Sequence, residues 1–268
     1  MNYIQSMILG LVQGLTEFLP VSSSGHLVLV QKLMGLSETS MKQAVSYDVA
    51  LHFATLIAVI SVMWRDVLEM IKKPFSKLTI YVVVATIPAL FFGFIFKDII
   101  ESVFGSGKTL GIEFLITGLI LLYADGVKSK GKNLDEMKLS DAGIIGLAQA
   151  IAILPAISRS GLTLAGGLFR GLNREFAIRF SFLMSIPAIL APSAYDALKM
   201  MKNDPSVAGG FPMDITLVGM LVAAVSGYFS VKFMLKIFSK SSFKPFCFYV
   251  FALGIYVIVD QLTPGGFF

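Results

Sequence analysis

The chain has 268 residues and a formal net charge of +5, with 56% hydrophobic and 15% charged residues. Soluble domains carry about 25% charged residues, so the composition excludes a water-soluble protein. The 23 phenylalanines and 24 glycines follow no period, which excludes disordered, coiled-coil and collagen-like chains. A single cysteine, Cys247, and two histidines exclude an intrachain disulfide and a thiolate metal cluster. We therefore predict an all-α integral membrane protein.

The chain begins with an interrupted apolar segment. Apolar residues run from Met1 to Leu19, a proline and serine–glycine cluster follow at Pro20–Gly25, and a short apolar run extends from His26 to Gly35. The last run is too short to cross a bilayer. Broken helices are tolerated at membrane depth only inside protein or along a cavity. We predict a re-entrant helix hairpin here.

Six apolar stretches and a second interrupted segment follow. The second segment consists of a helix over Ser140–Leu154, a break at Pro155–Gly161 and a short run over Leu162–Gly171. The stretches long enough to be transmembrane helices are Val45–Trp64, Leu78–Phe96, Thr109–Asp125, Phe176–Leu198, Ile215–Met234 and Pro245–Leu262.

The two interrupted segments are similar in sequence. Gly10–Gln13 matches Gly146–Gln149, and Ser22–Gly25 matches Ser158–Gly161 at the same spacing. Each copy contains one hairpin and three spans, and this odd number of crossings makes the second copy enter from the opposite side. We predict a single membrane domain over residues 1–268, built from two inverted-topology repeats at about 1–125 and 140–262. It would contain six transmembrane helices and two re-entrant hairpins.

Charged loops orient this arrangement. Basic residues gather at 65–77, 128–132, 170–174 and 232–244, and all four groups fall on one side if both hairpins are re-entrant. The positive-inside rule makes that side cytoplasmic. Both termini would then face outward.

Glu17 is the first candidate for chemistry, because a carboxylate inside an apolar helix is costly and is a functional hypothesis by default. Gln13 lies one turn earlier on the same face and offers a second oxygen. A structural ion pair between Glu17 and Arg159 is the alternative interpretation.

The serine–glycine clusters are candidates for anion binding. Each precedes a short helix, where free backbone N–H groups and the helix dipole attract anions. Hydroxyl groups add donors, and Arg159 adds a planar cation suited to phosphate oxygens. N-capping is the alternative interpretation. The predicted phosphate-binding residues are Ser22, Ser23, Ser24, Gly25, Ser158, Ser160 and Gly161.

His26 lies three residues after Ser23, so both side chains point the same way on a helix. An imidazole near a hydroxyl or a water is the minimum for base-assisted nucleophilic attack. We interpret Asp48, His52, Glu175 and Arg179 mainly as structural pairs near helix starts. Because a carboxylate and an anionic substrate repel each other, we expect a divalent cation, Mg²⁺ or Ca²⁺, held by oxygen atoms of Glu17 and Gln13.

At these residues the chain resembles the undecaprenyl-diphosphatase family, also called bacitracin-resistance proteins. The resemblance rests on the segments Gln13–His26 and Leu154–Thr163 and covers nearly the whole chain. It implies a cell-membrane hydrolase that converts a polyprenyl diphosphate into the monophosphate carrier plus inorganic phosphate for cell-envelope recycling. The active site would face the extracytoplasmic side.

The resemblance also implies roles for individual residues. Glu17 is the essential acid, His26 the essential histidine, Ser23 the active-site serine and Arg159 the phosphate clamp, while Ser160 and Thr163 complete the second motif. The sequence departs from the family at Gln13, where a pair of acids four residues apart is usual. Whether Ser23, His26 or water is the nucleophile stays open.

A lipid-phosphate flippase or transporter is the main alternative function, because inverted repeats with half-helices at the midplane are a transporter architecture. Phosphatases that use a second histidine after a Ser-Arg segment are disfavoured, since no histidine follows His52. The expected partners are the polyprenyl diphosphate lipid and the bilayer, with no nucleic acid. A homodimer is compatible with the sequence.

Overall fold

The computed structural model describes residues 1–36, 38–96, 107–127, 130–154, 157–201, 211–238, 241–263 and 266, and for residues 38–45, 196–197 and 199–201 only the course of the helix. The described residues are helical, with turns and one isolated bridge between Lys132 and Leu172 but no β-strand. This confirms the all-α prediction. Parts of two predicted basic loops (128–129 and 239–240) and of the second predicted break (155–156) lie outside the described residues.

The helices follow the predicted segments, with the exception of α4 (Trp64–Lys72), which lies largely in the predicted basic loop 65–77. Their bounds are α1 Tyr3–Phe18, α2 Ser23–Leu33, α3 Glu38–Val62, α4 Trp64–Lys72, α5 Lys77–Ile95, α7 Leu110–Gly126, α8 Leu139–Ile151, α9 Arg159–Phe169, α10 Arg174–Met201, α11 Met213–Phe233 with a π-helical extension Met234–Phe238, and α12 Lys244–Leu262.

Four helices are long and apolar enough to cross a membrane, and a fifth span exists if the bent pair Ser46–Val62 and Trp64–Lys72 is one unit. The four are Lys77–Ile95, Arg174–Tyr195, Met213–Phe238 and Lys244–Leu262. The predicted span Thr109–Asp125 forms α7, whose 17 residues rise only about 26 Å, against a hydrocarbon core of about 30 Å. The predicted span Val45–Trp64 ends earlier, because the chain turns by 85° at Met63 and Trp64 begins α4.

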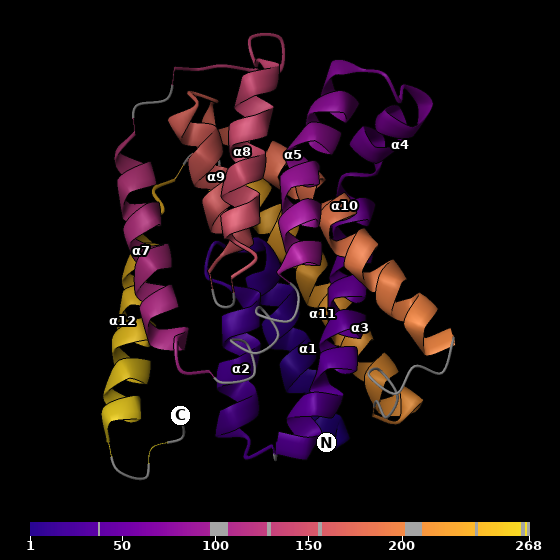
Figure 1. The fold of residues 1–268 in the computed structure, drawn as a ribbon, viewed down its shortest axis with the longest axis vertical. Coiled ribbons are helices and arrows are strands. Elements are labelled where there is room, and N and C mark those ends of the chain that lie inside the picture. Colours follow the sequence, from indigo (N-terminus) through magenta and orange to yellow (C-terminus); the bar gives the residue numbers. More distant parts are fainter. Residues whose placement is uncertain are drawn as a thin grey trace.

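Two helix pairs occupy the predicted interrupted segments. Figure 1 shows α1 and α2 in the lower half of the molecule, near the N-terminus, and α8 and α9 in the upper half. The second helix of each pair begins earlier than predicted, at Ser23 and Arg159. The reason is local: the Ser22 and Ser158 hydroxyls accept hydrogen bonds from the backbone N–H groups of Gly25 and Gly161 and cap the helices.

The first helix of each hairpin packs tightly on a span of the other half. Helix α1 lies against α11, and α8 lies against α5. A Cβ atom at Gly10 would collide with the carbonyl oxygen of Gly219 in α11, and one at Gly146 would collide with that of Ala85 in α5. Small residues permit such close contact between membrane helices. Gly10 and Gly146 are the glycines that match in the repeated sequence.

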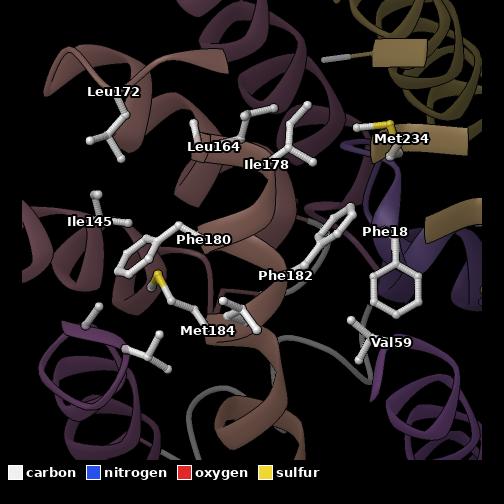
Figure 2. Packing of buried hydrophobic residues seen from close by; sticks show 14 of the residues in the cluster. Phe18, Val59, Ile145, Leu164, Leu172, Ile178, Phe180, Phe182, Met184 and Met234 are labelled. Carbon is white, nitrogen blue, oxygen red and sulfur yellow. The ribbon is translucent and has the colours of Figure 1, made fainter. Parts of the chain in front are cut away.

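The main buried cluster joins both halves of the chain. Figure 2 shows Phe18 of α1 and Val59 of α3 beside Phe182 of α10. Phe180, also of α10, and Ile145 of α8 lie on the other side of α10. The rings of Phe18 and Phe182 meet edge to face with centroids 5.4 Å apart. This packing fixes the end of α1, where Glu17 lies, relative to α10.

Candidate active site

Glu17 lies in the last turn of α1 and is 5% exposed. Its Oε2 atom accepts hydrogen bonds from Ser23 Oγ at 2.6 Å and from Gln13 Nε2 at 2.9 Å. Its Oε1 atom accepts one from the Arg159 guanidinium. A buried carboxylate needs such partners to stay charged. Glu17 is therefore the centre of a polar network inside an apolar protein.

Arg159 brings the second hairpin to this centre. It is the first residue of α9, and its ion pair with Glu17 joins the start of α9 to the end of α1. A second link lies nearby, because Ser160 Oγ donates a hydrogen bond to the Leu19 carbonyl at 2.9 Å. The two helix breaks, far apart in sequence, thus meet at one place.

The two serine clusters have the same local hydrogen bonding. In addition to capping the helices, Ser22 Oγ lies 3.4 Å from Ser24 Oγ, and Ser158 Oγ lies 3.2 Å from Ser160 Oγ. The N-termini of α2 and α9 thus have matching capping bonds, and their serines line the same cavity. Helix N-termini of this kind attract anions.

A cavity of ≈ 430 Å³ lies at this junction. This volume accommodates a diphosphate group with room to spare. Of the predicted site residues, those on its wall are Glu17, Ser22, Ser23, Ser24, Ser158, Arg159 and Ser160. Apolar residues such as Leu27, Ile153, Ile157 and Ile189 complete the wall.

His26 is not part of the cavity wall. Its Nδ1–H donates to the Ser22 carbonyl at 2.6 Å, and its Nε2 accepts from the Tyr249 hydroxyl at 2.7 Å. The ring also stacks on Tyr249 and meets Phe114 edge to face. Both ring nitrogens therefore have hydrogen-bond partners. The imidazole contacts the first helix break on the side away from the cavity.

Four other predicted residues also lie off the cavity wall, among them Gln13, which is fully buried in α1. Gly25 and Gly161 provide the N–H groups that the capping serines bind. Thr163 Oγ1 donates to the Arg159 carbonyl at 2.8 Å and lies 2.5 Å from Ser181 Oγ of α10. Thr163 thus connects α9 to α10.

The structure adds two wall residues that the sequence interpretation treated as structural, Asp48 and His52 of α3. His52 Nδ1–H donates to the Asp48 carbonyl at 2.7 Å, and its Nε2 lies 3.5 Å from Glu17 Oε2. Asp48 accepts from Gln31 Nε2 at 3.0 Å and is buried. One feature of the sequence could have indicated that Asp48 and His52 reach the site: both are ionisable residues within an apolar span. Arg179, which the sequence interpretation grouped with them, lies elsewhere and pairs with Asp66 of α4.

Comparison with known proteins identifies the family. The family model "Bacitracin resistance protein BacA" matches residues 6–256. The chain belongs to the BacA family. This confirms the family predicted from the two motifs, and the match includes both hairpins.

Members of the BacA family with curated names are similar over almost their full length. An undecaprenyl-diphosphatase of Carboxydothermus hydrogenoformans is 49% identical over 97% of this chain and 98% of its own. Undecaprenyl-diphosphatase 4 of Bacillus cereus (strain ZK / E33L) is 42% identical over 98% of this chain and 99% of its own. An undecaprenyl-diphosphatase of Halothermothrix orenii is 38% identical over 97% of this chain and 98% of its own.

The donor set for a divalent cation in this BacA-family chain is small. Among the described residues no three His, Cys, Asp or Glu side chains form a metal-binding group. Gln13 Oε1, however, is buried without a hydrogen-bond partner in the described part of the protein, one turn from Glu17. Mg²⁺ commonly takes one or two protein oxygens and completes its shell with phosphate and water. The residues fit such a cation.

Proposed function

We propose that this protein is an undecaprenyl-diphosphate phosphatase. It would hydrolyse the lipid diphosphate to the lipid monophosphate and inorganic phosphate, for recycling of the cell-envelope carrier and resistance to bacitracin. The observation that carries the proposal is the junction of Glu17, Ser23 and Arg159 on one cavity wall. The names of relatives at 38–49% identity support the substrate.

Arg159 and the two helix N-termini would bind the terminal phosphoryl group. The guanidinium fork matches two phosphate oxygens, and the N–H groups of α2 and α9 point to the same place. Arg159 now pairs with Glu17. An arriving diphosphate would compete for the guanidinium and release one oxygen of Glu17. The guanidinium and the helix N–H groups would stabilise the charge that develops on the phosphoryl oxygens during transfer.

Ser23 is the nucleophile in this proposal. Its hydroxyl already donates to Glu17 Oε2 at 2.6 Å, so the carboxylate can take the proton as Oγ attacks the terminal phosphorus. A bond forms between Oγ and phosphorus, and the bond to the bridging oxygen breaks, so that the lipid monophosphate leaves. Water then attacks the phosphoserine and the bond between Oγ and phosphorus breaks; the inorganic phosphate leaves with both protons of the water, and Glu17 returns its proton to Oγ.

His26 holds the attacking serine in place in this mechanism. Its hydrogen bond to the Ser22 carbonyl fixes the residue directly before Ser23. Ser22 has φ +70°, a left-handed conformation that is strained for a residue with a side chain. A partner on its carbonyl stabilises that conformation.

A divalent cation, Mg²⁺ or Ca²⁺, would be held by Glu17 and the unpartnered Gln13 Oε1. When bound, it would neutralise charge on the diphosphate and polarise the phosphoryl group. The protein's own residues would carry out nucleophilic attack and proton transfer.

The topology that suits this function is an inverted repeat with six spans and two re-entrant hairpins, over about 1–125 and 140–262. The packing supports it, because α1 on α11 corresponds to α8 on α5, and α3 on α11 corresponds to α10 on α5. The described basic loops lie at the upper end in Figure 1, which would face the cytoplasm of a multi-pass cell-membrane protein. The active site would open to the extracytoplasmic side.

Single cysteines in a Cys247→Ser chain test this topology. One cysteine placed just after α2, near Gly35, should be labelled by an impermeant reagent from outside the cell. A second placed just after α9, near Gly171, should be labelled only after the membrane is opened. Labelling of both from the same side would contradict the inverted repeat.

The function itself is tested with purified protein in detergent and undecaprenyl diphosphate. We expect inorganic phosphate to be released with Mg²⁺ or Ca²⁺ present, and release to fall after chelation. A flippase would bind the lipid without releasing phosphate, and would move a labelled lipid between leaflets of a reconstituted vesicle. Absence of phosphate release from folded, cation-loaded protein would overturn the proposal.

A further inference from the structure

Helix α4 carries an apolar strip that no other part of the described protein covers. The strip is formed by Trp64, Leu68 and Ile71, which are 53%, 39% and 70% exposed. Their spacing of four and three residues places them on one face of the helix. Phe75, just beyond the helix, is 88% exposed. Contiguous exposed apolar surface of this kind marks an interaction site.

The other face of α4 is firmly attached to the protein. Asp66 is buried and accepts hydrogen bonds from the Arg179 guanidinium of α10, one of them at 3.1 Å. Val67 and Met70 pack against the main buried cluster. The strip therefore faces away from the bundle because the opposite face is fixed, and its exposure does not result from a detached helix.

Two cations flank the strip. At 100° per residue, Arg65 and Lys72 lie along the same edge of it, two helical turns apart. The Arg65 guanidinium lies 5.5 Å from the centre of the Trp64 ring. Within the described ranges, no carboxylate pairs with Arg65 or Lys72, whereas Lys73 is paired with Glu69 at 3.2 Å. The two cations are thus available to an anionic partner beside the apolar strip.

The direction of α4 indicates where that partner lies. The helix is bent by 85° from the Ser46–Val62 part of α3, and Figure 1 shows it at the upper end of the bundle, projecting to the side. A helix perpendicular to the spans and at one end of them runs along the membrane–water boundary. Tryptophan, aliphatic side chains and flanking cations on such a helix match the acyl chains and phosphate groups of that layer.

We propose that α4 is an interfacial helix that binds anionic phospholipids. Trp64, Leu68 and Ile71 insert among the upper acyl chains, and Arg65 and Lys72 contact headgroup phosphates. A second copy of the chain fits this face less well, because a symmetric contact would bring the like-charged Arg65 and Lys72 pairs together.

Trp64 is the only tryptophan of the chain and reports directly on this surface. The protein is placed in nanodiscs of phosphatidylcholine and phosphatidylglycerol, with bromine on the acyl chains of one lipid or the other, and Trp64 fluorescence is measured. We expect brominated phosphatidylglycerol to quench more strongly, corresponding to a preference for that lipid of roughly fivefold for each of the two cations. In R65Q/K72Q the preference should fall to about one.

The matched control is K236Q/K244Q, which removes two exposed cations from other helices at the same end. It should keep the preference of the wild-type protein. Equal quenching by the two brominated lipids in wild-type protein would overturn the proposal. So would quenching by aqueous iodide in place of lipid bromine, which would put Trp64 in water. Loss of lipid quenching when a nanodisc holds two chains would assign the face to a second copy and also overturn it.

Discussion

The two helix breaks share one scaffold and differ in their chemistry. In both, a serine caps the second helix through a glycine N–H, at 3.3 Å for Ser22 and 3.0 Å for Ser158. The next residue, the first of α2 or α9, is Ser23 in one break and Arg159 in the other. The capping serines stabilise the turn, and the residue at the first helical position provides the functional group that each turn presents at the site. One break supplies a hydroxyl beside a carboxylate, and the other supplies a cation.

The backbones of the two breaks also differ. Ser22 has φ +70°, whereas Ser158 has φ −68°. The His26 side chain donates to the Ser22 carbonyl, whereas the residue at the same position of α9 is Leu162, which has no side-chain donor and binds the Ser158 carbonyl only through its backbone N–H at 2.9 Å. The first break is thus the more strained and the one with a dedicated support. Strain tends to be stored at functional sites, which agrees with the proposed nucleophile being on this side.

The largest effect is expected from Ser23→Ala. Removing the nucleophile should lower the rate of phosphate release by at least about 10³-fold, with thermal unfolding of the protein unchanged. The neighbouring variant Ser24→Ala is the control. Ser24 lies on the same cavity wall, but its hydroxyl is near another serine, Ser22 at 3.4 Å, and not beside the Glu17 carboxylate. It should stay within about threefold of wild type. Substantial turnover by Ser23→Ala would instead indicate direct attack by water.

A large effect on phosphate release is also expected when Arg159, in the second break, is substituted. Arg159→Ala should reduce phosphate release about 10²-fold or more, because it removes stabilisation of the developing phosphoryl charge. Arg159→Lys keeps a positive charge without the planar fork and should recover part of the rate, to within about tenfold of wild type. If Arg159→Lys is as inactive as Arg159→Ala in folded protein, paired hydrogen bonds matter more than charge. Full activity in Arg159→Ala would contradict the phosphate clamp.

His26 should show an intermediate effect. His26→Ala removes the side-chain partner of the Ser22 carbonyl, leaving only the backbone N–H of residue 26 at 3.2 Å, and should lower phosphate release about tenfold, while His26→Asn retains a side-chain donor and should restore part of the rate. The ratio of the two rates is the decisive readout, since an amide cannot act as a base. Equal loss in both variants would assign proton transfer to the imidazole.

The smallest effect is expected from substituting the two matching glutamines, Gln13 and Gln149, which should differ in their influence on the cation requirement. Gln13 and Gln149 each have a buried Oε1 without a partner among the described residues, but only Gln13 lies beside Glu17. Gln13→Ala should raise the Mg²⁺ or Ca²⁺ concentration needed for half-maximal phosphate release several-fold. Gln149→Ala loses a 3.2 Å hydrogen bond to the Ala85 carbonyl and should cost about 1 kcal/mol of stability without changing the cation requirement. Identical cation titrations of the two variants would remove Gln13 from the cation site.

Much of this architecture was predictable from the sequence. Apolar lengths indicated the helices, which the structure confirms, while the hairpins and the repeat indicated by the matching Gly10–Gln13 and Gly146–Gln149 segments stay predictions. The bend at Met63 was not predictable, because the apolar run continues through Trp64 and nothing in it interrupts a helix. The bend depends on the pairing of Asp66 with Arg179, two residues that are distant in sequence.

The site was predictable in composition and less so in arrangement. Glu17 and Arg159 are conspicuous because charge is costly inside a membrane protein. The different positions of His26 and His52 relative to the cavity depend on which face of α2 and α3 turns inward. His26 has Tyr249 of α12 as a partner, and His52 lies 3.5 Å from Glu17. Such long-range contacts leave no periodic trace in a single sequence.

The most direct test of a single site built from both breaks is a double-mutant cycle on Glu17 and Arg159. Phosphate release from undecaprenyl diphosphate is measured for Glu17→Asp, Arg159→Lys and the double variant, all partly active. Residues that act as one unit have strongly non-additive effects. We therefore expect the double variant to be no more than about threefold slower than the slower single variant. If the two losses simply multiply, the breaks act independently and a shared active site is contradicted.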